Sequence, residues 1–123
     1  MNLLDSILLL IDVNNKYIEN PNNPIIRDKR NKLKYYFLNS LKNSPEKSIV
    51  VKNYLENRLL EMNKKNIKDV EYFFIKSLLN KVETTYLMDL KELTLNQKKN
   101  FFSRDFNHLL YKKDEQFSKC LSI

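Results

Sequence analysis

The single histidine, His108, and Arg104 one helical turn before it are the residues whose types and spacing come closest to an acid–base pair. General acid–base catalysis needs a second group that orients the first or perturbs its pKa. The surrounding sequence offers no such group at a specific spacing. We therefore expect His108 to be a solvated surface residue and predict a protein without catalytic residues.

Metal binding is equally poorly supported by the residue types. One histidine and one cysteine, His108 and Cys120, do not supply the three or four ligands of a zinc site. Four glutamates could in principle pair across a helical bundle: Glu56 with Glu61, and Glu71 with Glu83. Because no Glu-x-x-His motif accompanies them, we expect solvent-facing charges, with no metal and no cofactor. Cys120 is expected to act as a small buried hydrophobic side chain.

The absence of glycine and alanine excludes whole classes of protein. A 123-residue chain without glycine cannot form Gly-rich phosphate loops, dinucleotide-binding turns or nucleophile elbows. The same composition contains 17 Asn and 18 Lys against 4 Arg, which is the usage expected from a strongly AT-rich gene such as that of a virus or mobile element. Codon bias is therefore one explanation for part of the net charge of +7.

The basic residues are nevertheless concentrated. Six cations and one carboxylate give residues 25–43 a net charge of +5. Cations near a helix N-terminus oppose the macrodipole and favour an external anion. The candidate anion-binding or partner-binding residues are Arg27, Lys29, Arg30, Lys32, Lys34 and Tyr35, together with Lys64 and Lys65 on a later connection. The alternative is a solvated lysine-rich face.

Aromatic residues interleaved with these cations could stack on nucleic-acid bases. Phe37 and Phe102 fall on apolar stripes, so Tyr35 or Tyr36 and Phe101 are expected to be free for stacking. No zinc spacing or helix-turn-helix glycine supports base readout, so any nucleic-acid contact would be directed at the backbone.

Apolar residues recur at helical spacing through most of the chain. They predict helices over about residues 3–19 and 25–42, a third starting at Ser44 and Pro45, a fourth over about 67–90, and a fifth starting at Thr94. Asn2, Ser44, Asn66 and Thr94 are the expected N-caps, Thr94 with Gln97 as a capping box. A short final helix around Phe117 to Leu121 is also expected.

No window alternates with a period of two, so we expect no strand. The predicted fold is all-α: one domain over residues 1–123, an up-and-down bundle of four to five helices. Six apolar residues are expected to be buried together: Leu55, Leu59, Phe74, Leu78, Phe102 and Phe106.

Tyr54 to Leu59 resembles the Tyr-Leu-x-x-Arg-Leu stretch in the helical domain of GINS replication-complex subunits. The resemblance covers one helix. It implies a role as a small subunit of a replication assembly.

The longest apolar run, residues 7–11, is too short for a transmembrane segment. A lone cysteine and the absence of a basic leader predict an intracellular, cytoplasmic protein that is not secreted. We expect a non-catalytic protein that docks onto an acidic protein or multiprotein assembly. The main alternative is a protein that binds the nucleic-acid backbone through the second helix; an enzyme and a protein resting on an anionic membrane are the others.

Overall fold

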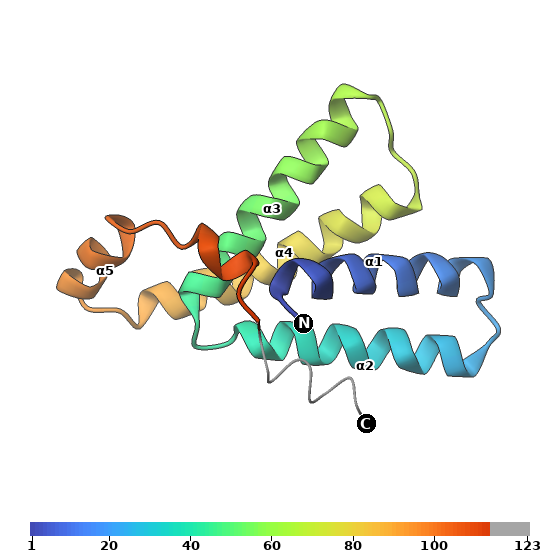
Figure 1. Ribbon diagram of the computed structural model, residues 1–123, viewed down its shortest axis with the longest axis horizontal. Helices are drawn as coiled ribbons and strands as arrows, with labels where there is room; N and C mark the ends of the chain where they lie inside the picture. Colours follow the sequence, from blue (N-terminus) through green and yellow to red (C-terminus); the bar gives the residue numbers. More distant parts are fainter. Residues whose placement is uncertain (114–123) are drawn as a thin grey trace.

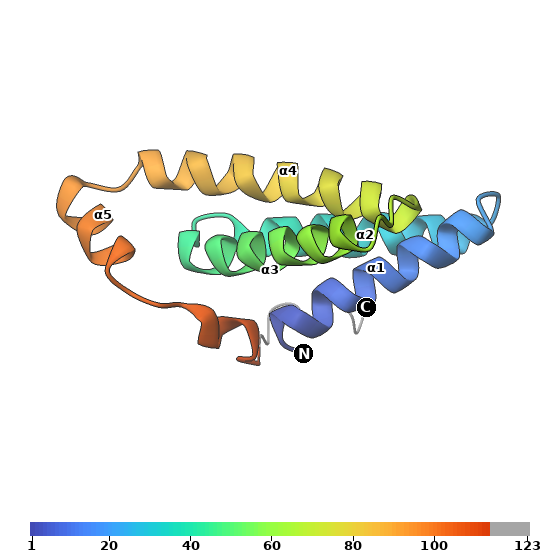
Figure 2. The same ribbon diagram turned by 90° about the horizontal axis from the view of Figure 1, so that it is seen from above.

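The computed structural model describes residues 1–113 as an all-helical bundle (Figure 1). Four long helices are followed by a short one and a 3₁₀ turn: α1 (Leu3–Glu19), α2 (Pro24–Leu41), α3 (Pro45–Lys64), α4 (Val70–Lys91), α5 (Leu95–Phe102) and η1 (Asn107–Leu110). Consecutive long helices run antiparallel, so α1 with α2 and α3 with α4 form two hairpins that cross each other (Figures 1 and 2). The all-α prediction is confirmed.

Within residues 1–113 there is no strand, and Asn2 and Lys113 form one isolated β-bridge. In the same part of the chain, no helix combines the length and the apolar character needed to cross a bilayer.

Most helix starts follow the local signals in the sequence. The Oδ1 atom of Asn2 accepts a hydrogen bond from the backbone N–H of Asp5 at 2.8 Å, which caps α1 as predicted. Pro24 and Pro45 occupy the first turns of α2 and α3, where the missing N–H carries no cost. Thr94 caps α5 through a complete capping box with Gln97.

One predicted cap is wrong, and another lies at its predicted position without a capping hydrogen bond. Asn66 adopts a left-handed backbone conformation with φ 57° and ends α3 instead of starting α4. Helix α4 begins three residues after the predicted position, where the side chain of Asp69 accepts a hydrogen bond from Tyr72. Ser44 lies at the predicted boundary, but its side chain makes no capping hydrogen bond and instead contacts Glu46.

The core lies between the two hairpins, and its apolar residues come from all four long helices. Of the six residues expected to be buried together, Leu55, Leu78 and Phe106 are buried. Leu59 and Phe74 are only partly buried and pack against the edge of this core. The prediction for Phe102 is wrong, because its side chain is 64% exposed.

The chain after α4 departs most from the sequence-based expectation. Helix α5 ends at Phe102, and a turn separates it from η1, so Phe102 and Phe106 do not lie on one helix. Leu95 and Phe102 are exposed, whereas Phe101 is buried and stacks on Phe106 at 5.2 Å between ring centroids. Figure 1 shows α5 at one end of the molecule, outside the four-helix bundle. The expected final helix and Cys120 lie outside the described residues.

Candidate anion-binding groove

The four cations at the start of α2 have different neighbours. Lys29 and Lys32 are exposed on α2. Arg27 lies 3.7 Å from the carboxylate of the adjacent Asp28. Arg30 packs instead against α1, with its guanidinium carbon 4.1 Å from the ring centroid of Tyr17. Among these four cations, only Lys29 and Lys32 form neither an ion pair nor a ring contact within residues 1–113.

Lys64 and Lys65 lie at the connection between α3 and α4, which stands away from α2 in Figure 1. The Nζ atom of Lys64 forms an ion pair with Glu61 at 3.3 Å, with both side chains exposed. The structure therefore does not bring this pair of lysines to the cations of α2.

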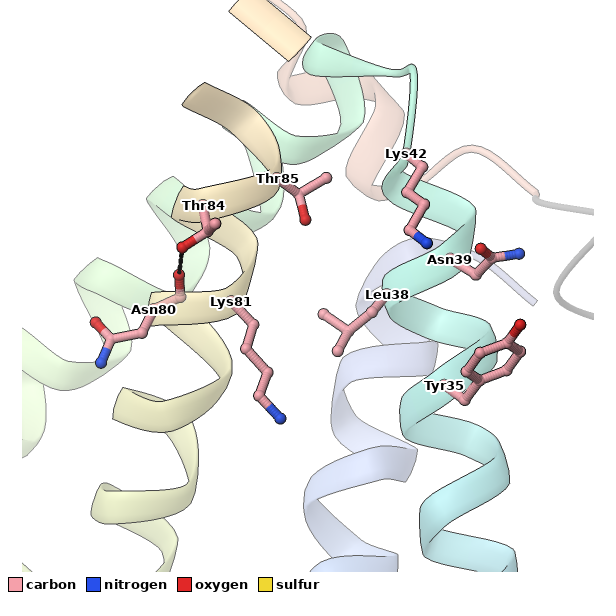
Figure 3. A pocket seen from close by; sticks show the side chains of 8 residues that line it. All are labelled: Tyr35, Leu38, Asn39, Lys42, Asn80, Lys81, Thr84 and Thr85. Atoms are coloured by element: carbon pink, nitrogen blue, oxygen red, sulfur yellow. Dashed lines mark hydrogen bonds between the residues drawn. The ribbon is translucent and has the colours of Figure 1, made fainter. Parts of the chain in front are cut away.

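A groove between α2 and α4 brings together polar and basic side chains from both helices (Figure 3). Its volume is about 460 Å³. We call it the α2–α4 groove, and its lining consists of Tyr35, Leu38, Asn39, Lys42, Asn80, Lys81, Thr84 and Thr85. Among residues 1–113, no carboxylate belongs to this lining. Of the residues expected from the sequence, Tyr35 lines the groove and Lys34 lies next to it.

Helical periodicity explains how α2 contributes to the groove. Lys34 and Leu38 are one helical turn apart on one face of α2, and Lys42 follows at the same spacing as the C-cap residue of the helix. Figure 3 shows Leu38 projecting from α2 toward α4 and Thr85 projecting from α4 toward α2, with Lys42 beside Asn39 on the α2 wall and Lys81 on the α4 wall. The groove therefore has lysines on both walls and a leucine between them.

The lysine ammonium groups crowd each other. Partial burial, together with the neighbouring Lys81 and Arg30, lowers the pKa of Lys34 from 10.5 to about 8. The Nζ atom of Lys34 also lies 5.8 Å from the ring centroid of Phe74 on α4. Among residues 1–113, the ion pairs that form do not involve Lys34, Lys42 or Lys81. A nearby anion would relieve this repulsion.

One acidic group of α4 beyond the groove is already engaged. Asp89 follows Thr85 by one helical turn, and its Oδ2 atom accepts a hydrogen bond from the backbone N–H of Asn43 at 3.0 Å. This contact joins α4 to the α2–α3 turn, so Asp89 stabilises the end of the groove without lining it.

The expected aromatic stacking surface is only partly present. Tyr35 is 64% exposed, and Tyr36 is half-buried with its ring against that of Tyr35. The prediction that Phe101 is free to stack is wrong, because this side chain is buried between Tyr86 and Phe106.

Sequence reasoning missed the α4 half of the groove and Lys42. The repeat of Lys34, Leu38 and Lys42 was a usable local signal for the α2 wall. No local signal pairs α2 with α4, because the two helices are separated in sequence by the whole of α3. Lys81 and Thr85 could therefore not be assigned to the same site as Lys42.

The remaining sequence candidates lie elsewhere. His108 is exposed in η1, and the guanidinium carbon of Arg104 lies 5.2 Å from the ring centroid of Phe106. Residues 1–113 contain no group of three or more histidine, cysteine, aspartate or glutamate side chains placed to hold a metal ion.

Tyr54 and Arg58, from the stretch that resembles GINS subunits, take part in a contact between helices. Arg58 donates to the Tyr54 hydroxyl at 3.2 Å and to the Glu71 carboxylate of α4 at 3.4 Å. Burial opposes the charge of Arg58, but these two partners raise its pKa. Comparisons of the chain with protein-family models, curated proteins and solved structures found no match.

Proposed function

We propose that this protein is a non-catalytic intracellular adaptor or small subunit that binds an acidic segment of another protein along the α2–α4 groove. The observation that carries the proposal is the groove itself, which has Lys42 on its α2 wall and Lys81 on its α4 wall and no lining carboxylate from residues 1–113. Lys34 adds a third ammonium group, which lies next to that of Lys81. An acidic segment would supply the missing negative charge.

The shape of the basic surface favours a protein segment over a nucleic-acid backbone. Backbone binding uses a row of cations that follows successive phosphates, whereas Lys29 and Lys32 are separated from Lys64 and Lys65 by the fold. The groove instead combines ammonium groups with the apolar side chain of Leu38 and the amide of Asn39. Such mixed surroundings suit a peptide with acidic and apolar side chains.

The proposal is tested with two variants of equal charge. Lys42→Glu with Lys81→Glu reverses two exposed groove lysines, and Lys29→Glu with Lys32→Glu reverses two exposed lysines of α2 outside the groove. Both lower the net charge from +7 by the same amount. Binding of a fluorescent peptide rich in Asp, Glu and Leu is measured by anisotropy at about 50 and 200 mM salt.

We expect the groove variant to lose binding at least tenfold, and the control variant to lose less than threefold. Equal losses in both variants would show attraction to overall charge and overturn the groove as the site. No binding by the parent at about 50 mM salt would overturn the acidic-segment proposal. A pull-down from the native host that is lost after nuclease treatment would point to nucleic acid instead.

A further inference from the structure

Helix α5 is attached to the bundle by one of its faces. Phe101 is buried, stacks on Phe106 and lies 6.2 Å from Tyr86 between ring centroids. Leu93, just before the helix, packs against the core. Figures 1 and 2 both show α5 at one end of the long axis of the molecule, outside the four-helix bundle. The side of α5 that does not carry Phe101 is therefore left open to an external surface.

This outer side of α5 combines two large apolar side chains with two lysines. Leu95 is 71% exposed and Phe102 is 64% exposed. They lie two helical turns apart, and Lys98 and Lys99 lie between them, one turn from each. Residues at these spacings share one face of a helix. We call these four residues the α5 face.

The positive charge of the α5 face is not balanced locally. Helix α5 contains no carboxylate, and neither Lys98 nor Lys99 forms an ion pair within the part of the chain that the structure describes. Exposed Lys91 and Arg104 flank the helix, and Glu92 is the one carboxylate between them. The stretch from Lys91 to Arg104 thus has four cations and one carboxylate, a net charge of +3.

Exposed apolar side chains and unpaired lysines on one face favour the surface of an anionic lipid bilayer as the partner. Leu95 and Phe102 can enter the boundary between head groups and acyl chains, while lysine side chains beside them reach the head groups with their ammonium ends. The outer side of a single helix is convex, so it offers no second wall to enclose a peptide, in contrast to the α2–α4 groove. A flat, negatively charged surface can contact both ends of the α5 face at once.

We infer that the α5 face binds the surface of anionic lipid bilayers, with Leu95 and Phe102 inserted at the boundary and Lys98 and Lys99 at the head groups. This inference goes beyond the proposed function, because the α5 face shares no residue with the α2–α4 groove. An adaptor held in this way at a negatively charged leaflet would keep its groove lysines available for a protein partner.

The first test measures co-sedimentation of the full chain with vesicles of phosphatidylcholine, either alone or with about one third phosphatidylserine. We expect at least tenfold stronger binding to the vesicles with phosphatidylserine, because each lysine near a negatively charged surface contributes about fivefold. Lys98→Gln with Lys99→Gln should remove most of this preference. Lys29→Gln with Lys32→Gln changes the net charge equally at two exposed positions of α2 and should preserve it.

The apolar half of the face is tested with a matched pair of variants. Leu95→Ala with Phe102→Ala should weaken binding to the phosphatidylserine vesicles at least tenfold. Leu60→Ala with Phe73→Ala is the control, because it removes the same two types of side chain at positions that are 52% and 58% exposed. These positions lie in the α3–α4 hairpin toward the end far from α5 (Figure 1), so the control should lose less than threefold.

A fluorescent reporter locates the contact directly. The chain contains no tryptophan, so one substitution introduces a single emitting site. Emission of the Phe102→Trp variant should shift to shorter wavelength when phosphatidylserine vesicles are added, because the indole leaves water. The Phe73→Trp variant is the control and should show no shift.

The outcomes separate this inference from the proposed function. Equal losses in the two alanine variants, or equal shifts in the two tryptophan variants, would overturn the α5 face as the point of contact. Equal binding to both kinds of vesicle would overturn the role of its lysines. No vesicle binding by the parent would overturn the membrane partner, and binding of the acidic peptide to the groove would be unaffected by any of these results. If the parent ignores vesicles and Leu95→Ala with Phe102→Ala loses the acidic peptide, the face belongs to the protein partner instead.

Discussion

Lys34 on α2 and Lys81 on α4 bring two ammonium groups together, and neither forms an ion pair within residues 1–113. The pKa of Lys34 is about 8 in the folded protein and 10.5 without these surroundings. Between these values the unfolded chain binds more protons, so this group makes the free energy of unfolding rise with pH. Below pH 8, the charged Lys34 destabilises the fold to its full extent.

Replacing Lys34 by an uncharged side chain of similar length should therefore stabilise the protein. We expect Lys34→Met to raise the midpoint of urea unfolding at pH 7, with a gain that shrinks toward pH 10. Lys29→Met, at an exposed position on the same helix, is the control and should show no such trend. A gain for Lys34→Met that is the same at both pH values would contradict the assigned pKa.

Arg58 and Glu71 should contribute measurably to the packing of α3 on α4. Their side chains are 29% and 24% exposed, and Asn15 of α1 also donates to Glu71 at 3.5 Å. Arg58→Met should cost about 1 to 3 kcal/mol, because it leaves partly buried partners without a charged hydrogen bond. A double-mutant cycle with Glu71→Gln should give a coupling energy of at least about 0.5 kcal/mol.

The surface pair of Asp12 and Lys16 provides the comparison for that cycle. Their atoms are closer, at 3.1 Å, but both side chains are more than half exposed. Solvent screening should limit their coupling to about 0.3 to 0.5 kcal/mol. Equal coupling energies for the surface pair and for Arg58 with Glu71 would show that partial burial does not strengthen the contact between Arg58 and Glu71.

Phe101 and Phe102 are adjacent in sequence, but truncating them should have very different effects on the free energy of unfolding. Phe101→Ala removes a buried ring from its contact with Tyr86 and Phe106 and should cost about 3 kcal/mol or more. Phe102→Ala should change the free energy of unfolding by less than about 0.5 kcal/mol, because the ring is exposed. Urea unfolding followed by circular dichroism measures both free energies. Similar losses of stability in the two variants would contradict the assignment of Phe101 as buried and Phe102 as exposed.

Phe101 and Phe102 also show which part of the fold the sequence pattern did not predict. A single helix extending beyond Phe102 would place Phe102, Phe106 and Leu109 on one stripe, which is what the periodicity predicted. The helix ends at Phe102 instead. Because a turn precedes η1, the helical spacing of residues is interrupted, and the ring of Phe106 stacks on that of Phe101. Helix starts were predictable because caps such as Asn2 and Thr94 act within four residues. The groove was not, because it depends on the pairing of α2 with α4.

Arg27 and Arg30 should differ in their effect on stability, although both lie in the first turns of α2. Arg30 packs on Tyr17 and donates to Asn14 of α1 at 3.4 Å, so Arg30→Ala should destabilise the α1–α2 hairpin by about 1 to 2 kcal/mol. The side chain of Arg27 forms an ion pair only with its exposed neighbour Asp28 among residues 1–113, and Arg27→Ala should be near neutral. Thermal unfolding of the two variants compares them directly, and equal midpoints would contradict the assigned contacts.

The salt dependence of nucleic-acid binding decides between the proposed acidic segment and the alternative partner. A site that neutralises four backbone phosphates gives a slope near −3 when log affinity is plotted against log salt, since each phosphate contributes about 0.7 to 0.9. If the groove is built for a protein segment, we expect only weak binding to DNA or RNA at about 50 mM salt, reduced equally by Lys29→Glu with Lys32→Glu and by Lys42→Glu with Lys81→Glu. These two variants have the same net charge and leave Arg30 in its contact with Tyr17, so a difference between them reports the site and not the fold. A slope near −3 that flattens only in the Lys29 and Lys32 variant would instead establish α2 as a nucleic-acid-binding helix and overturn the acidic protein partner.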